Sequence, residues 1–446
     1  MAKRVFKRKA YERLLQWKER SAGRTAMLVE GARRIGKSTI VEEFARKEYD
    51  TYILIDFSKA PQRVHDLFND LSDLDYIFMN LQLIYHVELK KRKSVIIFDE
   101  VQFQPKARQA IKHLVADNRY DYIETGSLIS IQKNVEGILL PSEEVRLKMY
   151  PMDYEEFRWA MGDEATIPLL RTMLSSKEKV SEGVHRQLMR DFRIYMLVGG
   201  MPQAVSAYLD TANLAEVDMR KREIIDLYES DFRKIDPTGN ISVFFDAIPA
   251  QLTKNAMRYQ VANVVENATY ARVAKKLTNL QESMTVNVAY HVSDPNVGMA
   301  LSKDTERYKL FVCDTGLFVT LAFKDRDFTE NVIYEKLLSD KLSANLGYIY
   351  ENVVAQMLVA AGSELYYYTF PTESGKHNYE IDFMIARKAK ICPIEVKSSG
   401  YNRHASLDAF ARKYSARIQD KYLIYTKPLR KDGDVCLLPV YMAGLI

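Results

Sequence analysis

Residues 31–38 have the types and the spacing of a loop that holds phosphate groups. The segment Gly31-Ala32-Arg33-Arg34-Ile35-Gly36-Lys37-Ser38 satisfies G-x-x-x-x-G-K-[ST], and Thr39 follows it. Glycines let the backbone fold tightly enough for its N–H groups to converge on phosphate oxygens, and a helix that begins here adds the positive end of its dipole. Lys37 is placed to reach the β- and γ-phosphates, and Ser38 to ligate Mg²⁺. The loop therefore predicts a site for ATP with Mg²⁺.

An apolar run that ends in two carboxylates predicts the other half of this site. Residues 95–100 read VIIFDE, and α/β sheets bind ligands at the carboxyl ends of their strands. We expect Asp99 to hold the water shell of Mg²⁺ and Glu100 to orient or polarise the attacking water, as a hydrolase requires. A chance match of residues 31–38 to the phosphate-loop pattern is disfavoured, because the strand that ends in two carboxylates accompanies the loop.

A third apolar run, residues 120–125, ends in Thr125-Gly126-Ser127. Its end places a hydroxyl beside the γ-phosphate, with Thr125 as the first candidate for a sensor and Ser127 as the second. Lys37, Glu100 and Thr125 are thus the candidate catalytic residues of this region of the chain.

The surrounding elements predict a doubly wound α/β fold with a mainly parallel sheet. A strand at 26–30, the loop at 31–39 and a helix at 40–48 follow one another. Strands at 52–57, 94–98 and 120–125 then alternate with helices at 63–71 and 106–117, which is typical of parallel sheets. We assign residues 1–160 to this domain.

The rest of the chain divides by pattern into three further segments. Helical periodicity at 184–197 and 219–232, interrupted by Gly199-Gly200-Met201-Pro202, predicts a helical lid or connector over 161–240. Helices over 244–283 and a hairpin at 285–292 and 308–313 predict a winged-helix module over 241–335. A helix at 348–361 and strands at 365–370, 380–385, 391–397 and 422–425 predict a C-terminal α/β domain over 336–446.

Several motifs resemble those of bacterial and archaeal AAA-type ATPases that are fused to a C-terminal domain of unknown function. They are GARRIGKST, FDEVQ, ETGS and LKMYPMDYEEF, followed by YMLVGGMP, VCDTGL and GYIYENVV at 195–202, 312–317 and 347–354. The family implies ATP binding, a winged-helix segment and a restriction-endonuclease-like C-terminus. It usually has Gly-Arg before the YPM segment, where this chain has Pro141-Ser142-Glu143-Glu144, so no arginine finger is assigned.

Charged residues of the C-terminal segment resemble the D…(E)xK signature of restriction-endonuclease-like nucleases. Asp382 follows Glu380, and Glu395-Val396-Lys397 closes an apolar strand, where period-two alternation places Glu395 and Lys397 on one face. Asp382 and Glu395 could bind one or two Mg²⁺ ions while Lys397 positions a water or stabilises the transition state of phosphodiester cleavage. Glu351 matches the first acidic position of that fold.

The alternative is a buried ion pair of Glu395 with Lys397 beside a solvated Asp382, in a nuclease fold kept only for binding. Glu351 shares a helix face with Val354, Ala355 and Leu358, and a charge on an apolar surface indicates a partner or a metal. Both interpretations stay open at this point.

Net charge and cysteine spacing limit the kinds of partner and metal site that this chain can have. The formal net charge is only +5, so binding of a nucleic acid would depend on segments with a local excess of positive charge. Two segments have such an excess: residues 1–24 and residues 397–431 each carry nine Lys/Arg and two acidic residues. The segment 270–280, with Arg272, Lys275 and Lys276, could be a recognition helix. Cys313, Cys392 and Cys436 show no metal spacing.

The sequence lacks the apolar stretch of a membrane span, and the N-terminus lacks an apolar signal core, which predicts a cytoplasmic protein without membrane contact. Two functions compete. The first is an ATP-hydrolysing enzyme that acts on or with DNA, and the second is a nucleotide-dependent switch whose nuclease-like domain is inactive. A homo-oligomer or a protein partner is compatible with both.

Overall fold

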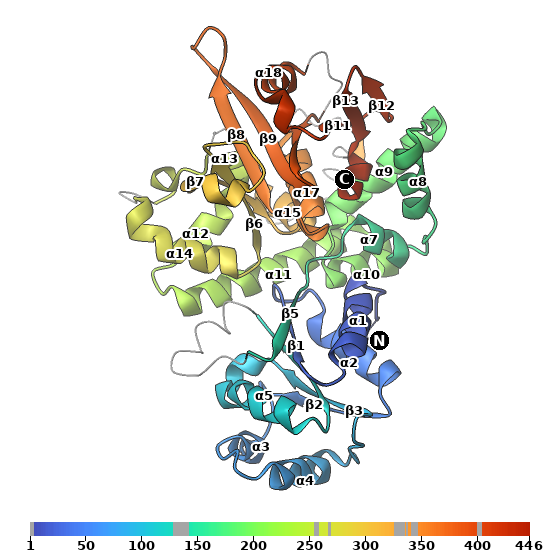
Figure 1. Ribbon diagram of the computed structural model, residues 1–446, viewed down its shortest axis with the longest axis vertical. Helices are drawn as coiled ribbons and strands as arrows, with labels where there is room; N and C mark the ends of the chain where they lie inside the picture. The colour runs from blue at the N-terminus through green and yellow to red at the C-terminus, as the bar shows by residue number, and fades with distance from the viewer. Residues whose placement is uncertain are drawn as a thin grey trace. The chain divides into compact units, whose positions relative to one another are not determined.

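A computed structural model of the chain describes residues 4–127, 142–253, 258–265, 269–324, 335, 338–339, 347–398 and 404–446. The chain forms two compact units (Figure 1). Unit 1 comprises Met1–Tyr150 with Glu282–Met284, and unit 2 comprises Pro151–Gln281 with Thr285–Ile446. The domain boundary expected at residue 336 lies outside the described residues. Pro141, which begins the segment that replaces the Gly-Arg of the family, also lies outside them. Among the described helices, none combines the length and the apolar character that crossing a bilayer requires.

Unit 1 is built on a five-stranded sheet in the order β2-β3-β4-β1-β5. The strands are β1 (Ala26–Glu30), β2 (Thr51–Asp56), β3 (Ser94–Asp99), β4 (Asp121–Gly126) and β5 (Glu144–Lys148). All neighbouring pairs are parallel, so the carboxyl ends of β1, β3 and β4 lie at the same edge. The parallel α/β fold predicted for this region of the chain is confirmed.

The helices of unit 1 are α1 (Lys9–Ser21), α2 (Lys37–Glu48), α3 (Gln62–Leu67), α4 (Leu74–Tyr85) and α5 (Pro105–Asp117). Helix α2 packs against β2, β3 and β4, and α5 packs against β4. Leu14 and Trp17 lie on the buried side of α1, whereas Leu15 is half-buried. The sequence does not predict β5, because the charged residues Glu144, Arg146 and Lys148 break the apolar pattern of a strand. Among the described strands, β5 pairs with β1 alone and lies at the edge of the sheet.

Unit 2 begins with a helical region. Its helices are α7 (Tyr154–Ala160), α8 (Thr166–Ser176), α9 (Glu182–Val198), α10 (Pro202–Thr211), α11 (Leu214–Ile235), α12 (Asn240–Asp246), α13 (Ile248–Thr253), α14 (Tyr270–Glu282) and α15 (Thr315–Ala322). The helices predicted at 184–197 and 219–232 correspond to α9 and α11. The Ser181 hydroxyl caps the start of α9 by accepting from the N–H of Val184, which satisfies one of the free amides of the first turn.

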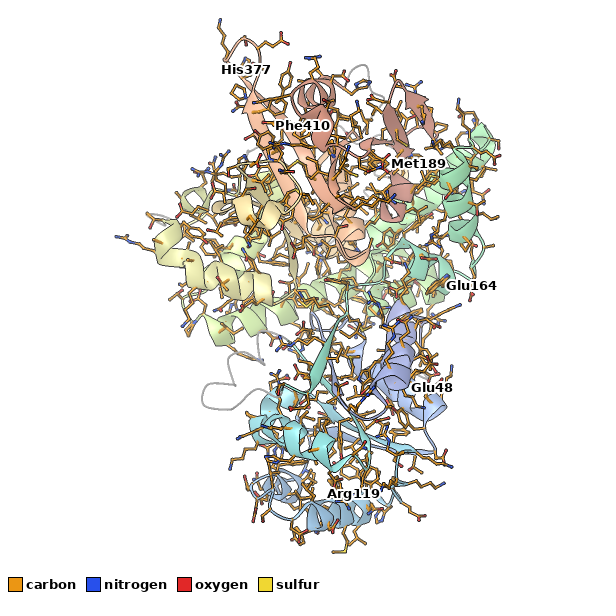
Figure 2. All side chains as sticks on the ribbon, in the orientation of Figure 1. Glu48, Arg119, Glu164, Met189, His377 and Phe410 are labelled. Carbon is orange, nitrogen blue, oxygen red and sulfur yellow. The ribbon has the colours of Figure 1, made fainter. Side chains whose placement is uncertain are left out.

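The second sheet has eight strands in the order β12-β13-β11-β10-β9-β8-β6-β7. Their bounds are β6 (Val286–Val292), β7 (Lys303–Val312), β8 (Leu365–Pro371), β9 (Asn378–Arg387), β10 (Lys390–Val396), β11 (Lys421–Tyr425), β12 (Arg430–Asp432) and β13 (Val435–Pro439). Helix α17 (Gly347–Ala360) packs on β6, β7, β8 and β10, and α18 (Ala405–Tyr414) on β9 and β10. Figure 2 places His377 in the long β8–β9 hairpin.

The hairpin expected in a winged-helix module forms, but its place in the sheet differs from that expectation. Strands β6 and β7 are antiparallel, and β6 also pairs in parallel with β8, through Ala289 and Leu365 among others. The sheet therefore runs on from β6 and β7 into the strands predicted for the C-terminal domain. Backbone pairing between distant strands leaves no mark in local sequence pattern, so the sequence could not reveal this continuity.

Three motifs of the family resemblance meet in the interior of unit 2. The buried Asp314 accepts hydrogen bonds from the N–H groups of Gly200, at 2.5 Å, and Leu317, at 2.9 Å. A Cβ atom at Gly199 would lie 2.2 Å from Oδ1 of Asp314, so only glycine fits there. Gln356 of α17 accepts from the N–H of Thr315 and donates to the Tyr195 hydroxyl. These motifs stabilise the fold of unit 2.

Candidate functional site

The loop between β1 and α2 has the shape that a phosphate group requires. Gly36 adopts φ +94° at the start of α2, a conformation that strains any residue with a Cβ atom. A Cβ atom at Gly31 would lie 2.3 Å from the carbonyl oxygen of Met149. Helix α2 begins at Lys37, and its first internal hydrogen bond runs from the N–H of Ile40 to Gly36, so the N–H groups of its first turn are available to an anion.

Lys37 points into this loop. Its side chain is buried, and Nζ donates to the carbonyl oxygens of Gly31 and Ala32 at 3.0 and 2.8 Å. Burial lowers the pKa of Lys37 to about 8, although Glu100 and Asp99 favour the charged form. An ammonium group held by two carbonyl oxygens can turn to phosphate oxygens, which accept its hydrogen bonds more strongly.

Asp99 joins three elements at the carboxyl edge of the sheet. It ends β3, and its Oδ1 accepts a hydrogen bond from the Ser38 hydroxyl at 2.7 Å. The hydroxyl of Thr125, in β4, donates to the same oxygen. The sequence places these three residues at the site, and the structure brings them together. Ser127, the second candidate sensor, lies beyond β4 and is half-buried.

Glu100 is held by two contacts next to Asp99. Its backbone adopts φ +53°, and its N–H group donates to the Thr125 hydroxyl at 3.4 Å. Its side chain accepts a hydrogen bond from Nε2 of Gln102, a residue to which sequence reasoning assigned no role. Gln102 stands in the FDEVQ motif, and its position two residues after the carboxylate was the signal that could have indicated it.

Arg8 is a second residue that sequence reasoning missed. Its guanidinium donates to the carbonyl oxygens of Ile35, in the loop, at 2.8 Å and of Tyr150 at 2.6 Å. Arg8 is only 5% exposed, and it lies in the basic N-terminal segment that could have faced phosphate. Sequence pattern alone does not distinguish this buried arginine from its exposed neighbours.

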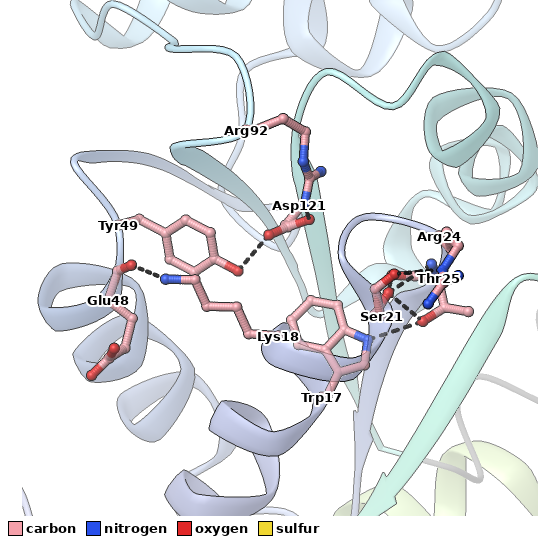
Figure 3. A network of polar contacts seen from close by, with 9 residues as sticks. All are labelled: Trp17, Lys18, Ser21, Arg24, Thr25, Glu48, Tyr49, Arg92 and Asp121. Carbon is pink, nitrogen blue, oxygen red and sulfur yellow. Dashed lines mark hydrogen bonds and ion pairs between the residues drawn. The ribbon is translucent and has the colours of Figure 1, made fainter.

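Other basic residues of the same segment also bind within unit 1 (Figure 3). The Lys18 ammonium donates to the carbonyl oxygen of Glu48 and lies 4.0 Å from the centre of the Tyr49 ring. The Arg24 guanidinium donates to the carbonyl oxygens of Ser21 and Arg20. Arg8, Lys18 and Arg24 therefore stabilise the fold of unit 1.

The remaining loop residues complete the arrangement. Ala32 and Ile35 are buried, Arg33 and Thr39 are half-buried, and Arg34 is exposed with φ +69°. The donor set fits ATP with Mg²⁺, because P-loop enzymes hold this ion through a Ser or Thr hydroxyl and an Asp at the end of a strand. Ser38 and Asp99 are such a pair, in direct contact.

Comparison with known families agrees with this geometry. Residues 23–158 match the family described as AAA domain. The N-terminal region of the chain contains an AAA-type ATPase domain. The match supports ATP binding and hydrolysis by this region. Residues 189–327 and 346–441 match two domains of unknown function, DUF8612 and DUF4143.

Three proteins with which the chain shares part of its length are distant from it in sequence. An uncharacterized protein of Methanocaldococcus jannaschii is 24% identical over 188 residues, which are 40% of this chain and 38% of that protein. A Walker-type ATPase of Pyrococcus abyssi has a TM-score of 0.41 at 15% identity, covering 71% of this chain and 96% of that one. PCH-2 of C. elegans has a TM-score of 0.28 at 12% identity, covering 48% and 69%. The family match and the loop geometry carry the assignment of the ATPase domain.

Unit 2 contains a cluster of charged side chains beneath α17. Electrostatic interactions link Glu351 of α17 with Asp382, and Asp382 with Glu395 of β10, while Lys397 forms an ion pair with Glu395 at 2.6 Å. The four residues that the sequence singled out are therefore neighbours. Oδ2 of Asp382 accepts from the N–H of Val396 at 2.7 Å.

Two further charged residues belong to this cluster. Lys309 of β7 forms an ion pair with Glu380 of β9 and interacts with Glu351 and Asp382. Sequence reasoning assigned neither residue a role, although a lysine inside the apolar run Tyr308–Val312 was a visible signal. We define the charged cluster as Lys309, Glu351, Glu380, Asp382, Glu395 and Lys397.

Burial and neighbouring charges shift the pKa values of two carboxyl groups in the charged cluster. Burial, together with Glu351 and Glu380, raises the pKa of Asp382 well above its ordinary value, against the effect of Lys309. Burial also raises the pKa of Glu351, with Lys309 and Lys397 acting in the opposite direction. Within the described residues, no group of three or more His, Cys, Asp or Glu side chains is placed to hold a metal ion. Binding of Mg²⁺ by Asp382 and Glu395 stays a prediction.

The basic residues that could face DNA are partly engaged inside unit 2. Lys276 of α14 forms an ion pair with Asp236 at 3.2 Å. In the C-terminal segment, Arg417 forms an ion pair with Asp294, and Lys421 with Asp434. Arg412 is 65% exposed and pairs with Glu373 at 3.4 Å, so its guanidinium stays accessible to a phosphate group.

Proposed function

We propose that the ATPase domain hydrolyses ATP with Mg²⁺ through residues 31–39, Asp99, Glu100 and Thr125, and that the chain uses ATP to act with DNA through unit 2. The hydrolytic role rests on one observation above others: Ser38 and Thr125 converge on one carboxylate oxygen of Asp99, directly beside Glu100. A passive nucleotide binder has no need of this second carboxylate.

Each residue of the site has its own task in this proposal. The first-turn N–H groups of α2 and the Lys37 ammonium bind the phosphate tail, while Ser38 and Asp99 hold Mg²⁺, which neutralises charge on the transferred phosphoryl group. Glu100 orients the attacking water, and Gln102 holds its carboxylate. Thr125 keeps Asp99 in position through its hydroxyl.

The DNA-directed role rests on the composition and element order of unit 2. Helix α17, strands β8, β9 and β10, helix α18 and strand β11 follow one another. They carry Glu351, Asp382, Glu395 and Lys397 at the positions that match a restriction-endonuclease-like fold. Arg272 and Lys275 on α14 would add contacts to the phosphate backbone, which contribute affinity without reading sequence.

A nucleotide-dependent switch is the second candidate function. In that case ATP binding changes the packing of the chain or its partner, and no strand is cut. The ion pairs of the charged cluster favour it, because Lys309 and Lys397 already neutralise Glu380 and Glu395. Cleavage of DNA by Glu351, Asp382, Glu395 and Lys397 stays a prediction.

The experiment compares the ATP turnover of wild type, Lys37→Ala and Glu100→Gln, each with and without duplex or single-stranded DNA. We expect Mg²⁺-dependent turnover in wild type, stimulation by DNA, and loss of turnover in both variants. Glu100→Gln should still bind ATP, because the residue acts on water and not on the phosphate tail. Turnover that DNA leaves unchanged would favour the switch, and an active Glu100→Gln would refute the catalytic assignment.

A further inference from the structure

Lys309 is a buried cation that comes from outside the segment with the nuclease-like signature. It lies on β7, whereas the other members of the charged cluster lie on or next to α17, β9 and β10. Its side chain is 8% exposed, and its ammonium lies 5.5 Å from the centre of the Tyr367 ring. Burying a lysine is costly unless the charge is paired, so its surroundings must supply a strong counter-charge.

The carboxylates of the cluster supply that counter-charge. Lys309 pairs with Glu380, whose side chain shares a strand face with Asp382 because the two residues are two positions apart. Glu351 and Asp382 also attract the ammonium. A positive charge is therefore already present on the side of the cluster where β7 and β9 approach α17.

One oxygen each of Glu395 and Asp382 is also engaged. Lys397 occupies Oε1 of Glu395, and the Val396 N–H group occupies Oδ2 of Asp382. Oε2 of Glu395 is buried without a hydrogen-bond partner within the described residues. Lys309 and Lys397 thus already supply positive charge where a divalent metal ion would supply it.

We propose that the Lys309 ammonium is the resident cation of the charged cluster and takes the place of a divalent metal ion there. The inference concerns unit 2 alone and stands whether or not the ATPase domain acts with DNA. A merely structural ion pair would make Lys309 matter for stability only. A resident cation makes a further prediction, because its removal leaves Glu351, Glu380 and Asp382 without the positive charge of Lys309.

The test measures Mn²⁺ binding to the full chain without nucleotide, from the loss of the free Mn²⁺ signal in electron paramagnetic resonance. Wild type and Asp382→Asn should bind Mn²⁺ alike, because the cluster holds none. Lys309→Met keeps the length of the side chain and removes its charge, and it should gain a Mn²⁺ site with at least tenfold higher affinity. The double variant Lys309→Met/Asp382→Asn should lose that site again, and Lys309→Arg, which keeps the charge, should behave like wild type.

Two outcomes would overturn the proposal. One is a wild-type Mn²⁺ site that disappears in Asp382→Asn, and this comparison needs no lysine variant. The other is a folded Lys309→Met, judged by circular dichroism and by unchanged ATP affinity, that gains no Mn²⁺ site. If Lys309→Met does not fold, the comparison of wild type with Asp382→Asn decides alone, since equal binding supports the proposal and a difference refutes it.

Discussion

The Ser38 hydroxyl donates a hydrogen bond of 2.7 Å to Oδ1 of Asp99, which links the first turn of α2 to the end of β3. Thr125 donates to the same oxygen from β4. The orientation of the Asp99 carboxylate thus depends on two hydroxyl groups from two other elements. Ser38 would itself contact Mg²⁺, whereas Thr125 contacts Asp99 and the N–H group of Glu100, so the two can be separated by substitution.

Replacing Thr125 by valine should lower kcat for ATP by about 10- to 100-fold, the usual effect of removing a residue that orients a metal ligand. Valine has the same shape but no hydroxyl group, so Asp99 and the Glu100 N–H group both lose their partner. Thr125→Ser should restore most of the activity. Steady-state turnover over a range of Mg²⁺ concentrations checks this, and a fully active Thr125→Val would contradict it.

Gln102→Met should lower kcat while leaving the affinity for ATP unchanged, because Gln102 donates a hydrogen bond to the side chain of Glu100, which acts on water. An unheld Glu100 orients water less well. Gln104→Met is the matched control, since Gln104 donates to the carbonyl oxygen of His65 instead. Turnover and nucleotide binding measured on both variants decide the point. Equal losses in both would show that the glutamines act only on folding.

Arg8→Met should weaken ATP binding by about tenfold, which is about 1.4 kcal/mol. Its guanidinium holds the carbonyl oxygens of Ile35 and Tyr150 together, so its loss loosens the back of the phosphate loop. Arg8→Lys should restore little, because one ammonium group lacks the planar fork that spans two acceptors. Titration with a fluorescent ATP analogue measures the affinity. Arg24→Met, from the same segment, serves as control and should bind ATP like wild type.

Glu124→Gln should stabilise unit 1 at neutral pH. Glu124 is fully buried, and burial together with the neighbouring Glu144 raises its pKa well above the ordinary value, while Arg108 and Arg146 act in the opposite direction. The folded carboxyl keeps its proton where the unfolded one loses it, so stability present at low pH is lost as pH rises through the folded pKa. Each unit of a pKa shift corresponds to about 1.4 kcal/mol.

Melting temperatures at acidic and at neutral pH test this. Glu124→Gln should exceed wild type at neutral pH, and the difference should shrink toward pH 4, where both states of the wild type bind the proton. Glu144→Gln is the counter-example, because Glu144 accepts two hydrogen bonds from Arg108 at 3.0 and 3.2 Å. That variant should melt earlier than wild type. A Glu124→Gln protein that melts at or below the wild-type temperature at neutral pH would refute the argument.

The sequence predicted the ATP site more fully than the charged cluster. Local motifs define the loop, the carboxylate strand and Thr125, because each lies at the end of one strand of a parallel sheet. Arg8 and Lys309 escaped prediction because they reach their partners from distant regions of the chain, and such contacts depend on tertiary packing. Glu380 was not predicted, because the nuclease signature includes Asp382 and has no position for Glu380.

The continuous sheet of unit 2 has a consequence for how such a chain can be inherited. Strands β6 and β8 are neighbours in the sheet, although β7, α15 and α17 lie between them along the chain. A recombination event between β6 and β8 would separate these two strands. Each part would then have an edge strand with unpaired backbone groups, which favours aggregation with other chains. Separating residues 286–312 from residues 365–439 would therefore break one continuous sheet, although two different family models match the two parts.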